Sequence, residues 1–309
     1  MQTLLVTHAA CLGHETPAGH PERADRLRAV LAALDAPEFA TLIRADAPLA
    51  TAEQLERVHL PIHVETILNA APASGFRRID ADTAMSPGSV EATLRAAGAV
   101  VHAVDEVMAG RARNAFCAIR PPGHHAEPDQ AMGFCLFNNV AIGALHARDA
   151  HGLKRPAVID FDVHHGNGTQ AAFEVDAALF YASTHQFPLY PGTGAPDERG
   201  VGNIVNACLA PGSGSAEFRE AFSTQVMPAL ARFEPDFIFI SAGFDAHTDD
   251  PLANLALTDD DYAWATAELM RYAAKQCAGR VVSTLEGGYD LGALRSSTTA
   301  HVRALQSAI

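Results

Sequence analysis

The sequence predicts an α/β fold in which helices cover both faces of a parallel sheet. Short apolar runs alternate with longer segments of helical periodicity, and no linker or internal repeat interrupts this alternation. Parallel strands need long crossover connections, and the helical segments supply them. With 309 residues, 48% of them hydrophobic, the chain can bury a large core. We expect one domain over residues 1–309.

The predicted elements follow from these runs in chain order. Strands are expected near residues 3–7, 115–120, 157–163, 179–183, 236–241 and 281–285, where apolar residues are bounded by polar residues or glycine. Helices are expected over residues 21–34, 87–109, 138–151, 166–174, 215–233, 258–277 and 291–307, several of which open with Pro, Ser, Thr or Asp. Long Pro- and Gly-rich segments at 71–89 and 185–214 predict loops that surround a site.

Charge and cysteine usage exclude several classes of function. The 22 Lys and Arg against 36 Asp and Glu give a formal net charge of -14, which opposes binding to a nucleic-acid backbone. The five cysteines are scattered without a C-x-x-C pair, which indicates a reducing compartment. The N-terminus lacks the pattern of a signal peptide or membrane anchor, so we expect a cytoplasmic protein without a membrane partner. The oligomeric state does not follow from the sequence.

Unusual polar residues stand at the carboxyl ends of four predicted strands. His124 and His125 follow one strand, the segment 160–165 closes the next, and Asp245 and Tyr289 follow two others. Open α/β sheets bind ligands at this edge, so these segments are expected to meet in one crevice.

The segment after residue 157 predicts a metal site. Strand alternation would place Asp160, Asp162 and His164 on one buried face, where unpaired carboxylates are costly and a cation resolves the cost. Asp162 and His164 are a plausible pair of metal ligands. Asp245 is the candidate for the third ligand, because a catalytic zinc typically has three protein ligands and an open position. These oxygen and imidazole donors also suit Mn²⁺ or Fe²⁺, so the residues alone do not select the metal.

The two adjacent histidines predict acid/base chemistry beside this metal. The Pro-Pro-Gly segment before His124 and His125 would hold their rings in place, and either imidazole could move a proton near neutral pH. Asp160 could orient His124, and the Gly-Gly turn could aim the phenol of Tyr289 at a developing oxyanion. Zincin, phosphate-loop, dinucleotide-binding and serine-hydrolase signatures are absent from the sequence.

Five motifs in order, PPGHHA, GFCLFNN, IDFDVHHGNGT, SAGFDAH and LEGGYDL, resemble the histone deacetylase and acetylpolyamine amidohydrolase family, in particular its class II-like bacterial members. The resemblance spans nearly the whole chain and implies an arginase/deacetylase-like three-layer α/β fold with a central, mostly parallel sheet of about eight strands, more than the pattern alone provides. It also implies that Asp162, His164 and Asp245 hold zinc. By the same match, His125 is the general base, His124 is its partner, and Tyr289 faces the zinc across the acyl carbonyl.

The resemblance implies further sites. A structural potassium ion would be bound by Asp160, Asp162, His164, Ser183 and Thr184, and a second by Phe173, Asp176, Leu179 and Asn203. A narrow acyl-lysine channel would be lined by Gly133, Phe134 and Tyr190, with Leu252 and Asp82 also assigned to substrate binding.

Three positions depart from common family patterns. Asn167 stands where some branches carry an Asp, which makes us expect a less basic His125. Tyr190 replaces a common Phe, and Leu252 replaces the Glu of polyamine-specific relatives. The expected function is therefore a zinc-dependent removal of acetyl or other short acyl groups from an acyl-lysine peptide or protein or a related N-acyl amine. The alternatives are an acetylpolyamine or small N-acetyl metabolite deacetylase, a two-manganese ureohydrolase, and a silent acyl-ligand-binding protein.

Overall fold

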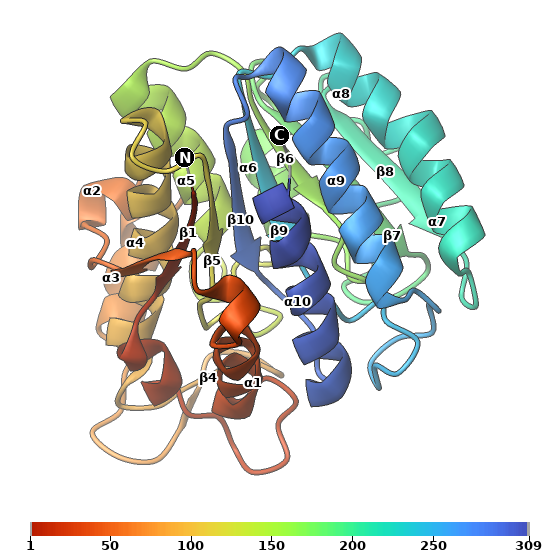
Figure 1. The fold of residues 1–309 in the computed structure, drawn as a ribbon. Coiled ribbons are helices and arrows are strands. Elements are labelled where there is room, and N and C mark those ends of the chain that lie inside the picture. The colour runs from red at the N-terminus through yellow and green to blue at the C-terminus, as the bar shows by residue number, and fades with distance from the viewer. Residues whose placement is uncertain (1, 308–309) are drawn as a thin grey trace.

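A single eight-stranded sheet organises the chain, as the computed structural model describes it over residues 2–307 (Figure 1). Every neighbouring pair of its strands is parallel. The predicted fold class is therefore confirmed, while residues 1, 308 and 309 of the predicted domain lie outside the described residues. In the sheet order β2-β1-β5-β10-β9-β6-β7-β8, the strands are β1 (Thr3–Thr7), β2 (Ile43–Asp46), β5 (Asn114–Cys117), β6 (Pro156–Asp160), β7 (Phe180–Gln186), β8 (Ile204–Leu209), β9 (Phe237–Ala242) and β10 (Val281–Leu285).

Helices cover both faces of the sheet. On one face α4 packs against β1, β5 and β10, and α5 packs against β6 and β9; on the other face α10 lies between α1 and α9 (Figure 1). The helices are α1 (Ala24–Leu34), α2 (Ala52–Leu55), α3 (Pro61–Leu68), α4 (Ser89–Met108), α5 (Asn139–His151), α6 (Asn167–Phe173), α7 (Ser215–Ala221), α8 (Met227–Phe233), α9 (Asp259–Gln276) and α10 (Leu291–Ser307). The seven predicted helical segments are confirmed, and the one over 215–233 consists of α7, a π-helical turn (Phe222–Val226) and α8.

Both edge strands were missed by the sequence prediction. Along β2 partly buried residues alternate with exposed ones, and β8 interrupts its apolar residues with an asparagine, whereas β6, β9 and β10 are buried throughout. A strand buried on both faces reads as a continuous apolar run, but an edge strand does not. The prediction of about eight strands, which came from the family resemblance, is confirmed. The count from the apolar pattern is too low because edge strands do not appear as continuous apolar runs.

Smaller elements occur in several of the connecting loops. A two-stranded antiparallel ribbon joins β3 (Arg77–Arg78) to β4 (Ala84–Met85), and short 3-10 turns cover Ala9–Gly13 and Pro37–Phe39. These ribbon residues fall inside the predicted loop over 71–89. None of the helices within residues 2–307 combines the length and apolar character that crossing a membrane requires.

Candidate active site

Four adjacent strands bring the predicted site residues together. The sheet order places β5, β10, β9 and β6 side by side, and the loops after these strands carry the two histidines, Tyr289, Asp245 and the 160–165 segment. Strand β6 ends at Asp160, earlier than predicted, so Asp162 and His164 lie on the following loop rather than on strand positions. The convergence at one sheet edge agrees with the prediction. The placement of Asp162 and His164 on one strand face with Asp160 was wrong, because the strand ends at Asp160.

Asp162, His164 and Asp245 form a compact donor cluster at this edge. The Nδ1 atom of His164 lies 3.1 Å from Oδ1 of Asp162 and 3.1 Å from Oδ2 of Asp245. All three residues are buried, and their donor atoms lie within 4.8 Å of one another. Two buried carboxylates beside one imidazole are the arrangement that a divalent cation stabilises.

Backbone groups hold the two carboxylates in place. The N–H of Gly287 donates to Oδ2 of Asp162 at 2.8 Å, and the N–H of Val163 donates to Oδ1 of Asp245 at 2.9 Å. A Cβ on Gly287 would approach Oδ2 of Asp245 to 2.1 Å, and one on Gly243 would approach Oδ2 of Asp162 to 2.0 Å. Glycine is therefore required at both positions so that the backbone can close around the carboxylates.

The two carboxylates of this cluster favour a positive charge beside them. Burial disfavours a charged imidazole, but hydrogen bonds and charge from Asp162 and Asp245 raise the pKa of His164 to about 10. Burial and the charge of Asp162 raise the pKa of Asp245. Both shifts reflect an excess of negative charge, which a bound cation would neutralise.

The two adjacent histidines have different hydrogen-bond partners. Nδ1 of His124 lies 3.0 Å from Oδ2 of Asp160, which also accepts from the hydroxyl of Tyr181 at 3.1 Å. Nδ1 of His125 lies 2.8 Å from Oδ1 of Asn167. Because an amide oxygen only accepts, Nδ1 of His125 carries the proton and Nε2 keeps a free lone pair.

The pKa values of these two histidines diverge. Burial lowers the pKa of His124, but the charges of Asp162 and Asp160 outweigh it and raise that pKa to about 10. Burial and the positive charges of His124 and His164 lower the pKa of His125 well below its usual value. Near neutral pH the pair therefore holds one charged ring, that of His124, and one neutral ring, that of His125, and only the neutral ring can accept a proton.

Glu286 fixes the loop that carries the histidines, a role that the sequence did not reveal. Its Oε2 accepts from the N–H of Gly123 at 2.7 Å and from the N–H of His124 at 3.1 Å. Burial raises the pKa of Glu286 to about 7 despite the nearby charge of His124. The motif that contains Glu286 was visible, but its contact joins residues 163 positions apart, which no local pattern reports.

Two further residues that the sequence did not single out act on Tyr289. The guanidinium of Arg26 lies 4.8 Å from the centre of the phenol ring and donates to the carbonyl oxygens of Gly288 and Glu286. The carboxylate of Asp250 accepts from the N–H of Tyr289 at 2.6 Å. Burial raises the pKa of Tyr289 well above its usual value, so the phenol is a neutral hydrogen-bond donor.

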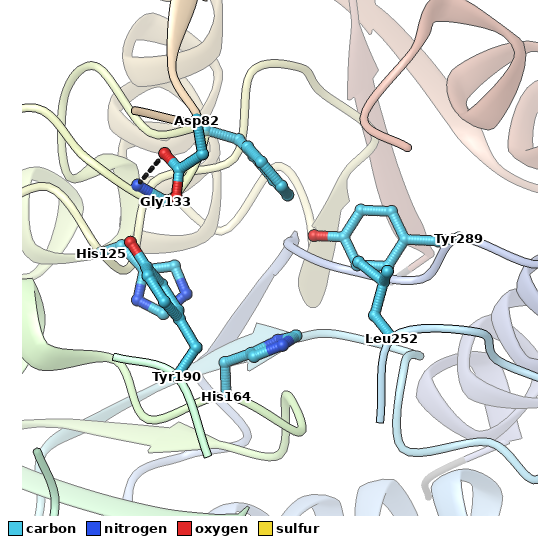
Figure 2. A pocket seen from close by; sticks show the side chains of 8 residues that line it. Asp82, His125, Gly133, His164, Tyr190, Leu252 and Tyr289 are labelled. Atoms are coloured by element: carbon cyan, nitrogen blue, oxygen red, sulfur yellow. Dashed lines mark hydrogen bonds between the residues drawn. The ribbon is translucent and has the colours of Figure 1, made fainter. Parts of the chain in front are cut away.

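A cavity of about 220 Å³ leads to the donor cluster (Figure 2). Figure 2 shows the phenol oxygen of Tyr289 directed into this cavity, across from His125 and Tyr190. The cavity contains every residue that was predicted to bind substrate, together with three predicted to act at the metal. Its lining consists of Asp82, His125, Gly133, Phe134, His164, Tyr190, Leu252 and Tyr289.

The rim is shaped by a contact between the 80–83 turn and the loop at residues 133–134. The N–H of Gly133 donates to Oδ1 of Asp82 at 3.1 Å, and the N–H of Phe134 donates to the hydroxyl of Thr83 at 3.0 Å. Gly133 has a φ of 57°, and a Cβ there would meet the ring of His125 at 2.5 Å. The loop can therefore pack this closely against the ring of His125 only because residue 133 is glycine.

Comparison with known proteins decides the family. Residues 20–305 match the histone deacetylase domain family. The chain belongs to this family. It is 41% identical over 278 residues to the histone deacetylase-like amidohydrolase of Pseudomonas aeruginosa, a match that covers 88% of this chain and 73% of that protein. Family membership makes the protein a deacetylase-type hydrolase and agrees with the resemblance deduced from its motifs.

Other histone deacetylases match over nearly the whole chain. Histone deacetylase 14, chloroplastic, of Arabidopsis thaliana is 42% identical, with 98% of this chain and 76% of that protein covered. The crystal structure of the HDA15 HD domain superposes with a TM-score of 0.93 at 36% identity, covering 99% of this chain and 88% of that chain. The fold is thus shared with a solved member of the family.

The first predicted potassium site of this deacetylase contains a polar group that a cation would satisfy. The hydroxyl of Thr184 is buried without a hydrogen-bond partner among residues 2–307. Next to it in the chain, the hydroxyl of Ser183 lies 2.8 Å from Nδ1 of His185. The side-chain oxygens of Asp160 and Asp162 already accept hydrogen bonds, so potassium at Asp160, Asp162, His164, Ser183 and Thr184 stays a prediction.

The second predicted potassium site does not fit a cation. Nδ2 of Asn203 donates to the carbonyl oxygens of Phe173, Asp176 and Leu179 at 2.8, 3.1 and 2.8 Å. Oδ1 of Asn203 accepts from the N–H of Val201 at 3.2 Å, which fixes the orientation of the amide. The three carbonyls thus already converge on a donor, and the side-chain amide stands where a potassium ion was predicted.

Proposed function

We propose that this histone deacetylase family member is a zinc-dependent amidohydrolase that removes acetyl or other short acyl groups from acyl-lysine or a related N-acyl amine. One observation carries the proposal: a buried donor cluster closes a narrow cavity into which a neutral histidine and a neutral phenol also point. We further propose that residues 1–309 form one catalytic domain. Potassium bound by the set that includes Asp160 and Thr184 is proposed as a structural ion.

The residues that would hold zinc are Asp162, His164 and Asp245. When bound there, zinc would supply a Lewis acid that polarises the acyl carbonyl and lowers the pKa of water. The chain contributes the base, because the free Nε2 of His125 is positioned to accept a proton from the attacking water. Its Nδ1–H remains bonded to Asn167 throughout, so the ring does not turn away.

The remaining groups stabilise charge and return the proton. The neutral phenol of Tyr289 donates a hydrogen bond to the oxyanion that forms as the carbonyl is attacked. His124, charged and bonded to Asp160, keeps positive charge beside the reacting atoms and lowers the pKa of His125. A protonated His125 then becomes acidic enough to deliver its proton to the leaving amine.

The cavity walls indicate the substrate class. The ring of Tyr190 stands edge-to-face with that of His125 at 5.3 Å between ring centres, and Phe134 stands edge-to-face with Tyr289 at 6.0 Å. Aromatic walls around a narrow entry suit an aliphatic chain that ends in a neutral amide. Leu252 adds an apolar surface, which favours acyl-lysine over a polycationic chain.

One observation supports a second substrate class. The carboxyl group of Asp82 is only partly buried at the cavity rim and could pair with a cationic amine of an acetylpolyamine. Burial raises the pKa of Asp82, so its carboxyl group holds a proton more readily than an exposed one. An acetylpolyamine or small N-acetyl amine is therefore the alternative substrate.

A substrate panel tests the proposal. Zinc-loaded protein would be given acetyl- and other acyl-lysine peptides, acetylpolyamines and small N-acetyl metabolites, and released acid would be measured. We expect the acyl-lysine peptides to have the highest kcat/KM, and His125→Ala to abolish their turnover while leaving bound zinc unchanged. Turnover of none of these amides, or full turnover by His125→Ala, would refute the proposal.

The predicted cytoplasmic location stays a prediction, since the Arabidopsis relative is named as chloroplastic.

A further inference from the structure

We propose a second metal site, for a divalent transition metal such as zinc, formed by Asp105, His146 and His151. Asp105 lies near the carboxyl end of α4, and both histidines lie near the carboxyl end of α5. These helix ends lead into the amino ends of β5 and β6, so the cluster is at the opposite edge of the sheet from the catalytic cavity. The site does not depend on the proposed function.

Three donor atoms converge on one point of the surface. Nε2 of His146 and Nε2 of His151 each lie 2.7 Å from the same oxygen, Oδ1 of Asp105. The two rings are nearly perpendicular, with 5.5 Å between their centres. Ligands of a metal bound at about 2.0–2.2 Å lie about 3 Å apart, so small movements of the partly exposed Asp105 would open the space for an ion.

The chemistry of these donors suits a transition metal. Two imidazoles and one carboxylate favour Zn²⁺, Cu²⁺ or Ni²⁺ over Mg²⁺ or Ca²⁺, which prefer oxygen donors. The side chains of Asp105 and His151 are 42% and 26% exposed, whereas that of His146 is 7% exposed. An ion could therefore reach the cluster from solvent and bind against a nearly buried histidine, with open positions left for water.

Arg57 opposes binding at this site and supplies a sharper prediction. Its Nη1 donates to Nδ1 of His146 at 2.7 Å, which leaves the proton of that ring on Nε2, pointing at Asp105. A metal on Nε2 would move this proton to Nδ1, where it would face the guanidinium of Arg57. Arg57 can turn instead to Glu53 or Asp149, each with an oxygen 3.7 Å away. Removal of the guanidinium should therefore tighten metal binding.

Zinc stoichiometry of the folded, zinc-loaded protein tests the site. Equilibrium dialysis against increasing zinc, followed by elemental analysis, would compare wild type with His151→Ala, Asp105→Asn and the matched control His102→Ala. His102 lies on α4 outside the cluster. We expect wild type and His102→Ala to bind one zinc more than either cluster variant, and Arg57→Met to bind this additional zinc about tenfold more tightly.

Zinc bound at the proposed second site can be distinguished from zinc bound at the catalytic site by variants of each. His164→Ala should lose the catalytic zinc and retain the second one. Equal zinc content in wild type, His151→Ala and Asp105→Asn would show that the cluster is a hydrogen-bonded triad only and would overturn the proposal. An unchanged or weaker second affinity in Arg57→Met would also overturn it, because the assigned ligand atom Nε2 of His146 requires the opposite change. Circular dichroism would verify that each variant is folded.

Discussion

Asn167 accepts the Nδ1–H of His125, and replacing it with an acid gives a directional test of the proposed base. In the wild-type protein a neutral amide oxygen holds Nδ1 of His125 at 2.8 Å, in a buried position. Asn167→Asp would place a carboxylate at that atom. Nδ2 of Asn167 also donates to Oε1 of Glu127 at 2.7 Å, so the new carboxylate would face Glu127. Glu127→Gln should therefore be combined with it, so that an amide donor replaces the opposing acid.

The size of the effect follows from the charge on the acceptor. A hydrogen bond to a charged group contributes about 1.5–3 kcal/mol, against about 0.5–1.5 kcal/mol for a neutral one. The difference of about 1–1.5 kcal/mol corresponds to about one pKa unit. A base works only when neutral, and the pKa of His125 lies well below its usual value in the wild type. The acid limb of the activity profile should therefore move upward by about one pH unit in the double variant.

The assay is the pH dependence of kcat/KM for an acetyl-lysine peptide, with Glu127→Gln alone as the matched control. Asn167→Asp alone should show a smaller shift, because the two neighbouring carboxyl groups would share a proton. An acid limb at the same pH in the double variant and in Glu127→Gln would refute the assignment of His125 as the base.

Three other changes have defined outcomes. Tyr289→Phe should lower kcat by about 10²–10³-fold with unchanged zinc content, measured by acetate release and elemental analysis, because one oxyanion donor is lost; full activity would exclude that role. Asp250→Ala should lower kcat more than it raises KM, since Asp250 holds the N–H of Tyr289 rather than the substrate; a pure KM effect would contradict this. Asn203→Ala should destabilise the protein by about 1–3 kcal/mol, and potassium chloride should restore its Tm more than it raises that of wild type, because the carbonyls of Phe173, Asp176 and Leu179 lose the side-chain amide that donates to them, while the first two keep a backbone N–H donor. Equal potassium responses would contradict the assignment.

The central features of the fold could be predicted because they depend on short-range patterns. Buried strands such as β6 and β9 appear as continuous apolar runs, and α9 and α10 show helical periodicity over long segments. The edge strand β2 alternates partly buried with exposed residues, and the four-residue helix α2 is too short for a periodic signal. These elements depend on their neighbours, which the local sequence does not report.

The candidate site shows the same division between local and distant information. Asp162 and His164 are two residues apart, and their donor character is visible in one motif. Arg26 lies 262 positions from Gly288, to whose carbonyl it donates, so only the folded chain reveals its place beside Tyr289. At Asn203 the family resemblance implied a potassium ion, but the side-chain amide itself donates to the three carbonyl oxygens. Which of two donors fills a polar pocket depends on side-chain geometry, which a motif does not encode.

The central claim is that a metal held by Asp162, His164 and Asp245 is required for amide hydrolysis. The most direct test is the rate of acetate release from an acetyl-lysine peptide as zinc is returned to chelated protein. We predict that the rate for wild type rises to saturation from the value measured without protein, and that the rate for His164→Ala stays at that value. Full activity of the chelated protein, or equal activation of His164→Ala, would contradict the account.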